Sequence, residues 1–368
     1  MSNFSTQNMP RQVWAHYHPF YGTPDGPARK WLTWDEPLRL ASGYGVPEFQ
    51  PPDEVKKLLR HNPNDMLAPN RRSNYSVYYP TIGLYDSRDK SVLLQHAKWA
   101  QQASIDALIW DYMLVGGDNE DKNKPIAETI YDQSFRMMLN ILLENNLPLN
   151  LTIMYDSYCW FGYPIERVAN ELTYLAHSYF EHPKVVHFDG RIAIHLYSAL
   201  AKHSAEDWDA ICKILEQKGI RKKLFLIAGE IFIYDDHFTQ PGIFDGFCLY
   251  NYGMDNWNPE GVKECSAHLK RLCERNEVTY WSAAVGPGFD GRIWHHPGRA
   301  VARGLGRLYE SMWQQAIEES APVITICSFN EWGEGTQIEP CLEYEDLYLK
   351  LTRKWADRFK HGELLDPD

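Results

Sequence analysis

Short apolar runs rich in β-branched and aromatic residues alternate along this chain with amphipathic stretches of helical period. The expected strands are residues 13–18, 105–112, 149–155, 191–197, 224–230, 244–250, 278–284 and 323–329. The expected helices are residues 89–102, 126–146, 163–180, 205–218, 259–275, 301–319 and 344–360. Such alternation implies parallel strands joined by right-handed crossovers. Eight strand and helix units fit a closed (β/α)8 TIM barrel, an α/β fold, better than an open doubly wound sheet.

A chain of 368 residues could hold two or three domains at roughly 100–200 residues each. The regular alternation instead predicts a single barrel domain over residues 1–368, with residues 1–11 as a flexible N-terminal segment. Residues 19–88 break the regular spacing, because they separate the first strand from its helix. In a barrel this is a loop at the carboxyl ends of the strands, where active sites are built. Its aromatic residues, which include Tyr21, Trp31, Trp34, Tyr78, Tyr79 and Tyr85, are predicted to wall a cleft.

Charge and aromatic content narrow the class of ligand. The 13 Trp, 22 Tyr and 15 Phe suit a site that stacks on flat, amphipathic ligands such as sugars or bases. Lys and Arg number 37 against 49 Asp and Glu, a net charge of -12, and a nucleic-acid binder normally carries a basic footprint. We therefore expect an oligo- or polysaccharide partner, neutral rather than anionic, and no nucleic acid.

The chain carries no apolar run of about 18 residues that would span a membrane, and its N-terminus lacks the apolar core of a signal peptide. Its seven cysteines are an odd number without a CxxC pair, and several fall in apolar stretches. Reduced, buried thiols are the expected state of such cysteines. The sequence thus predicts a soluble cytoplasmic protein without a membrane partner, or a secreted or periplasmic one if a leader was removed.

Polar residues at the carboxyl ends of the expected strands should face the mouth of the barrel. Most are acidic or aromatic: His16, Tyr17, His18, Asp111, Tyr112, Tyr155, Asp156, His195, Tyr197, Glu230, Tyr250, Asn251, Tyr252, Asn330, Glu331 and Glu334.

Residues 328–340, SFNEWGEGTQIEP, follow the eighth expected strand and carry the sharpest local signal. Glu331 and Glu334 would face opposite sides of a continuing strand, but Gly333 and Gly335 allow a turn that brings both carboxylates into one pocket. Glycoside hydrolysis needs such a pair, one acid that protonates the leaving oxygen and one carboxylate that acts as base or nucleophile. Trp332 could add a stacking wall. The alternative is a solvated loop whose glutamates are surface charges.

Other chemistries have weaker signals. His16, His18 and the His295–His296 pair could bind a metal with Asp111 or Glu230, but no decisive ligand spacing such as HExxH is present. No GxGxxG follows the first strand, and neither GxxxxGK[ST] nor GxSxG occurs. The sequence therefore predicts no metal and no cofactor.

The Gly-Pro-Gly at 286–288 is either an anion cradle or a structural turn, and Asp290 and Arg292 are fit to grip sugar hydroxyls.

The stretch SFNEWGEGTQIEP resembles the hallmark of glycoside hydrolase family 99, the endo-α-1,2-mannosidases, in which two glutamates separated by Trp-His close the active site. Other matching segments run in the same order: FYGTP at 20–24, WLTWDEP at 31–37, YDSRDKSVLLQH at 85–96, IFDGFCLYNYG at 243–253, AVGPGFD at 284–290 and LYLKLTRKWADRF at 347–359. The resemblance implies a (β/α)8 barrel that cleaves internal α-mannosidic bonds with retention and without a metal. It implies that Glu331 acts as base on the substrate's own 2-hydroxyl, giving a 1,2-anhydro sugar. Glu334 would protonate the leaving group and later activate water.

The chain departs from the family pattern at several positions. Gly333 stands where the mannosidases typically have His, Thr152 stands in place of a subsite His, Asp111 replaces an expected aromatic, and the arginine after GPG is displaced to Arg292. We therefore expect the chemistry to carry over, with an internal α-mannosidic bond as the leading specificity and a related α-glycosidic bond as the alternative. The predicted substrate-binding residues are Tyr17, Trp34, Asp35, Asp111, Tyr112, Tyr155, Tyr250, Tyr252, Arg292, Asn330 and Trp332. The EWGEG…EP ending is also similar to family-99-like domains of polysaccharide-biosynthesis proteins, so a non-catalytic glycan-binding barrel stays open as the alternative.

Overall fold

A computed structural model of the chain describes residues 11–36, 39–40, 61–113, 124–156, 163–230, 238–251, 254–296 and 298–362. The expected N-terminal segment, except Arg11, and the predicted site residue Tyr252 lie outside the described residues. Within the long first loop, residues 61–70 are mostly exposed, whereas Tyr75, Tyr79 and Tyr85 are buried.

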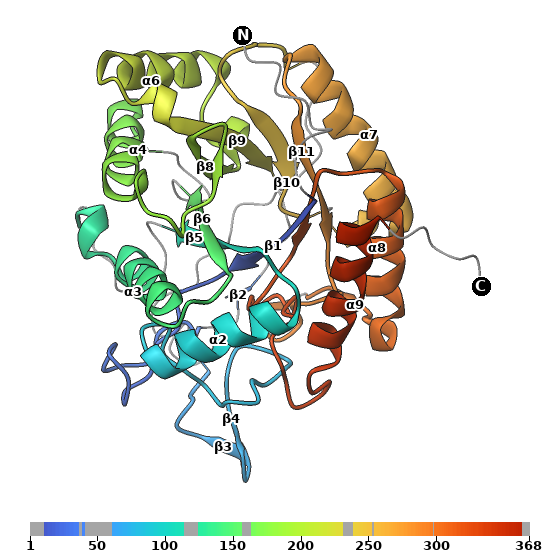
Figure 1. Cartoon of the computed structure of the whole chain (residues 1–368). Coiled ribbons are helices and arrows are strands. Elements are labelled where there is room, and N and C mark those ends of the chain that lie inside the picture. The colour runs from blue at the N-terminus through green and yellow to red at the C-terminus, as the bar shows by residue number, and fades with distance from the viewer. Residues whose placement is uncertain are drawn as a thin grey trace.

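Eight parallel strands close into a barrel (Figure 1). They are β1 (Gln12–Tyr17), β5 (Ala107–Met113), β6 (Asn150–Asp156), β8 (Arg191–Tyr197), β9 (Leu224–Glu230), β10 (Gly246–Leu249), β11 (Tyr280–Val285) and β15 (Val323–Ile326). Their order is β6-β5-β1-β15-β11-β10-β9-β8, and pairing of β6 with β8 closes the ring. The structure confirms the predicted (β/α)8 barrel, and each expected strand overlaps an observed one.

Helices surround the barrel, as Figure 1 shows. They are α2 (Lys90–Gln102), α3 (Ile130–Glu144), α4 (Ile165–Tyr179), α5 (Ala199–Lys202), α6 (Ala205–Gln217), α7 (Pro259–Arg275), α8 (Arg307–Glu318) and α9 (Leu347–His361). Side-chain caps fix several starts: Asp89 accepts from Ser91 N, and Ser204 and Asp207 form a capping box. The expected helix at 301–319 starts late, because Leu305 takes a left-handed φ of 55° within the turn η5 (Gly304–Gly306).

Short elements decorate this frame. β2 (Arg39–Leu40) pairs with β13 (His295–His296), β3 (Met66–Ala68) with β4 (Arg71–Arg72), β12 (Phe289–Asp290) with β14 (Ala300–Val301), and β7 (His187–Phe188) with β8. Three further single turns are η2 (Ile126–Glu128), η3 (Arg221–Lys223) and η4 (Met254–Asn256). No helix in the described part of the chain is both long and apolar enough to cross a membrane.

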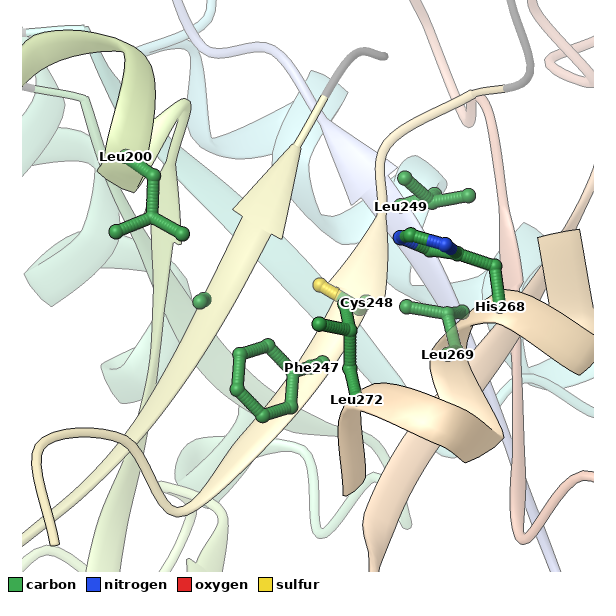
Figure 2. A pocket seen from close by; sticks show the side chains of 8 residues that line it. Leu200, Phe247, Cys248, Leu249, His268, Leu269 and Leu272 are labelled. Atoms are coloured by element: carbon green, nitrogen blue, oxygen red, sulfur yellow. The ribbon is translucent and has the colours of Figure 1, made fainter. Parts of the chain in front are cut away.

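Aromatic rings fill the amino end of the barrel. The Trp14 ring lies 5.5 Å from Phe188 and 6.3 Å from Tyr280, and Phe188 lies 5.2 Å from Phe225. A second apolar region, between β9, β10 and α7, contains a small hollow (Figure 2) lined by Leu200, Ala228, Phe247, Cys248, Leu249, His268, Leu269 and Leu272. This hollow shares no residue with the predicted site. The predicted site residues lie instead at the carboxyl ends of the barrel strands.

Candidate active site

Residues 327–341, which we call the glutamate loop, follow β15. The loop folds back on itself: Ser328 N donates to Thr336 O (3.0 Å), and Glu339 N donates to Phe329 O (2.9 Å). Gly335 N donates to Trp332 O, and Gly335 has a left-handed φ of 59° that glycine adopts without steric cost. The peptide between Cys327 and Ser328 is cis. Glu331 and Glu334 thus sit on a tight turn and not on a continuing strand.

Glu331 is buried at the mouth of the barrel, with 6% of its surface exposed. Its backbone N–H donates to Ser328 Oγ at 2.7 Å, and its Oε2 lies 3.2 Å from His18 Nε2. The same imidazole nitrogen lies 3.2 Å from the Tyr250 hydroxyl and 3.8 Å from Asp111 Oδ2. His18, Asp111, Tyr250 and Glu331 therefore form one polar cluster, which draws on β5 and on the residues that follow β1, β10 and β15.

Glu334 is half-buried, and its carbonyl accepts a hydrogen bond from Asp290 N at 2.7 Å. Burial, the neighbouring Cys327 and then the carboxylates of Glu334 and Glu331 raise the pKa of Tyr250. Burial and the same two carboxylates also raise the pKa of the Cys327 thiol. Because both glutamates act on one phenol and one thiol, their carboxylates share the same end of the barrel.

The charges in this cluster are set by burial. Desolvation lowers the pKa of His18 to about 3, so its ring is neutral at physiological pH. The neutral ring therefore lies beside the Glu331 carboxylate as a polar group and not as a cation. Burial and the nearby Asp156 carboxylate raise the pKa of Asp111, and Lys202 opposes that rise. Asp156 and Lys202 form an ion pair with each side chain only 3% exposed.

Two predicted substrate-binding residues serve the frame of the site. Asn330 Oδ1 accepts from His18 N at 2.7 Å, and Asn330 Nδ2 donates to His18 O at 3.0 Å, so the amide ties the glutamate loop to the end of β1. The Trp332 indole N–H donates to Glu339 Oε2 and to the Tyr85 hydroxyl, both at 3.1 Å. Trp332 is fully buried, so its ring is not the stacking wall that the sequence suggested.

Three predicted tyrosines point outward, away from the cluster. Tyr17 binds His96 of α2 at 2.8 Å, Tyr112 binds Asp132 of α3 at 3.2 Å, and Tyr155 binds Glu171 of α4. Successive strand residues face opposite sides, so a strand end offers only alternate side chains to the mouth. His18 and Asp111 hold the inward positions next to Tyr17 and Tyr112.

The remaining predicted residues lie in the loops. Trp34 is fully buried and donates to Tyr85 O at 2.8 Å, which makes it part of the packing of the first loop. Asp35 beside it is half-buried. Arg292 has a side chain 63% exposed and pairs with Asp290 at 2.5 Å. Of the first-loop aromatics that were expected to wall a cleft, Tyr21, Trp34, Tyr79 and Tyr85 are buried, and Trp31 and Tyr78 are half-buried.

Sequence reasoning placed His18 at the mouth and considered it as a metal ligand but did not include it among the predicted site residues, and it missed Lys202. His18 comes two residues after His16, so both side chains face the same side of the strand, and this spacing could have marked His18 as inward. Lys202 lies in the short helix α5, outside any strand end, and has no such signal. Among the described residues, no three His, Cys, Asp or Glu side chains are grouped to hold a metal ion.

Comparison with known proteins decides the family. The model of glycosyl hydrolase family 99 matches residues 8–361. This chain belongs to that family. Glycoprotein endo-alpha-1,2-mannosidase of Mus musculus is 28% identical over 387 residues, which span 94% of this chain and 74% of the mouse protein. The Xenopus laevis protein of the same name is 26% identical, and the match covers 93% of this chain and 76% of the Xenopus protein.

A solved structure supports the same fold. The family 99 endo-alpha-mannosidase of Bacteroides thetaiotaomicron superposes with a TM-score of 0.71 at 20% identity, covering 96% of this chain and 98% of that one. As a member of family 99 the chain is a glycoside hydrolase, and its substrate is an oligosaccharide or other glycan.

Proposed function

We propose that this family 99 chain is a retaining, endo-acting hydrolase of α-mannosidic or closely related α-glycosidic bonds. The observation that carries the proposal is the placing of two carboxylates, buried Glu331 and half-buried Glu334, on one turn beside Tyr250 and His18. The relatives named endo-alpha-1,2-mannosidase support the choice of sugar.

Glu331 is the proposed base. Its carboxylate removes the proton from the substrate's 2-hydroxyl, and that oxygen attacks the anomeric carbon to give a 1,2-anhydro sugar. Neutral His18, with its Nε2 3.2 Å from Glu331 Oε2, lies beside this carboxylate. The half-buried Glu334 donates its proton to the glycosidic oxygen as that bond breaks. Glu334 then takes a proton from the water that opens the anhydro ring at the anomeric carbon, while Glu331 returns its proton to O2.

The experiment is a screen of α-1,2-, α-1,3- and α-1,6-linked mannans and other α-glycans, with products identified by mass and the first-formed anomer followed by NMR. The proposal expects internal cleavage of at least one α-mannan with an α-anomeric first product. Cleavage that starts with the β-anomer would refute retention. Release of single sugars from the chain end would refute endo action.

A second substrate set tests the role of the sugar's own oxygen. A matched substrate that lacks only the 2-hydroxyl should be cleaved at least about 1,000-fold more slowly, because the proposed nucleophile is absent. Comparable rates on both substrates would show that a protein carboxylate attacks directly. Assays with and without a strong chelator run alongside, and the proposal expects equal rates.

A further inference from the structure

Gly333 lies between the two proposed catalytic glutamates and has a backbone that any residue could adopt. Unlike Gly335, it does not have a positive φ. Its constraint is space. A Cβ at this position would stand 2.2 Å from Cε2 and 2.9 Å from Cζ of Tyr75, and 3.0 Å from Cε3 of Trp294. The Tyr75 ring therefore occupies the volume in which a side chain of residue 333 would begin.

Tyr75 comes from the long first loop and is fully buried. Its ring meets Trp294 edge to face at 5.6 Å and Trp34 at 6.3 Å. These contacts hold the ring from two sides, so it cannot move aside at low cost. A methyl group at residue 333 would have to displace either this packed ring or the backbone of the glutamate loop.

Hydrogen bonds connect Tyr75 to both sides of Glu331. Its hydroxyl lies 3.1 Å from the Tyr21 hydroxyl. That Tyr21 hydroxyl donates to Asn330 O at 2.9 Å and accepts from Trp332 N at 3.1 Å. Burial raises the pKa of both phenols, and the Glu331 carboxylate adds to the rise, so both stay protonated. The backbone that flanks Glu331 thus rests on two phenols of the first loop.

We propose that Tyr75 is a positioning residue whose ring, seated against Gly333, fixes where Glu331 and Glu334 stand relative to each other. The inference rests on the proposed catalytic roles of these glutamates. Tyr75 has no exposed surface, so it acts through the loop and not by touching substrate. Its loss should lower kcat and leave KM within about twofold.

The test is a double-mutant cycle in the full-length chain, with Gly333→Ala, Tyr75→Ala and both together, followed by kcat, KM and thermal unfolding. With Tyr75 present, Gly333→Ala should lower kcat at least about 100-fold, since small misplacement of reacting groups costs that much. In the Tyr75→Ala background, the same change should cost less than about threefold, because the ring that opposes the methyl group is gone. Equal costs in both backgrounds would overturn the proposal.

Two controls separate positioning from general loss of stability. Tyr79→Ala removes another buried ring of the same loop, and in that background Gly333→Ala should keep its full cost. Tyr75→Phe retains the ring and should retain most of kcat if packing dominates. If the proposed catalytic roles fail, Glu331→Gln and Glu334→Gln will keep their turnover. The coupling between residues 75 and 333 would then still appear in the unfolding temperatures.

Discussion

The two ends of the barrel interior are filled by different chemistry. At the amino end, Trp14, Phe188 and Tyr280 pack ring against ring, and the buried His195 ring meets Trp14 edge to face. At the carboxyl end, His18 and Glu331 stand within 3.2 Å of each other, and both are buried. Aromatic packing stabilises a fold by removing apolar surface from water, whereas burying charged groups costs stability unless they are paired.

The contrast assigns different tasks to the two ends. The amino end holds the barrel closed, and the carboxyl end keeps a buried polar cluster that is useful for chemistry and poor for stability. Substitutions should therefore separate cleanly: those at the mouth change turnover, and those at the opposite end change the free energy of unfolding.

The largest effect is expected for the two carboxylates. Glu331→Gln and Glu334→Gln should each lower kcat by about 1,000-fold or more, a loss of roughly 4 kcal/mol of transition-state stabilisation, since each removes a proton-transfer group. The unfolding temperature should stay within a few degrees of wild type. Initial rates on the cleaved α-glycan and thermal scans measure both. Turnover near wild type in either variant would remove that residue from the mechanism.

Trp14→Ala should produce the opposite pattern. Trp14 is fully buried, and its truncation should cost about 3–5 kcal/mol of unfolding free energy. Urea unfolding measures this loss. Turnover per folded molecule should stay within about twofold of wild type at low temperature, because the indole lies at the far end from Glu331. A large fall in kcat of folded Trp14→Ala would mean that the two ends are coupled.

The same alternation of side chains explains what the sequence could and could not predict. Eight apolar runs predicted the barrel, and the two glutamates on a glycine-rich turn stood out because such a turn is a local property. Whether a strand-end side chain faces inward or outward depends on register, which a single sequence does not reveal. The predicted substrate-binding residues therefore include the outward Tyr17 and Tyr112, next to the inward His18 and Asp111. The packing of Tyr75 on Gly333 joins residues that are distant in sequence, and it left no periodic signal.

Buried histidines should make the protein sensitive to acid. Burial lowers the pKa values of His16, His18 and His195 below the ordinary 6.5, to about 3 for the last two. Below pH 6.5 the unfolded chain binds protons that the folded protein does not, so stability falls as pH falls. Each histidine contributes about 1.4 kcal/mol per pH unit in that range.

Urea unfolding between pH 7 and pH 4 measures this slope. His195→Gln should reduce the slope by about one histidine's share and leave turnover per folded molecule largely intact, because His195 lies below the mouth, against Trp14 and His16. His18→Gln should reduce the slope and turnover together. An unchanged slope in both variants would show that these rings are protonated in the folded protein.

The smallest effect is expected at the rim, where the exposed Arg292 side chain pairs with the buried Asp290 carboxylate. Its side chain is 63% exposed, and exposed ion pairs contribute about 0–1 kcal/mol. Arg292→Ala should therefore shift the unfolding temperature by no more than about 2 °C. If the guanidinium grips a sugar hydroxyl, KM should rise up to about tenfold with kcat unchanged, and Arg292→Lys should recover part of the loss. A kcat loss near that of Glu334→Gln would instead mean that the ion pair at the rim takes part in catalysis. The connection would be Asp290, whose N–H donates to the Glu334 carbonyl.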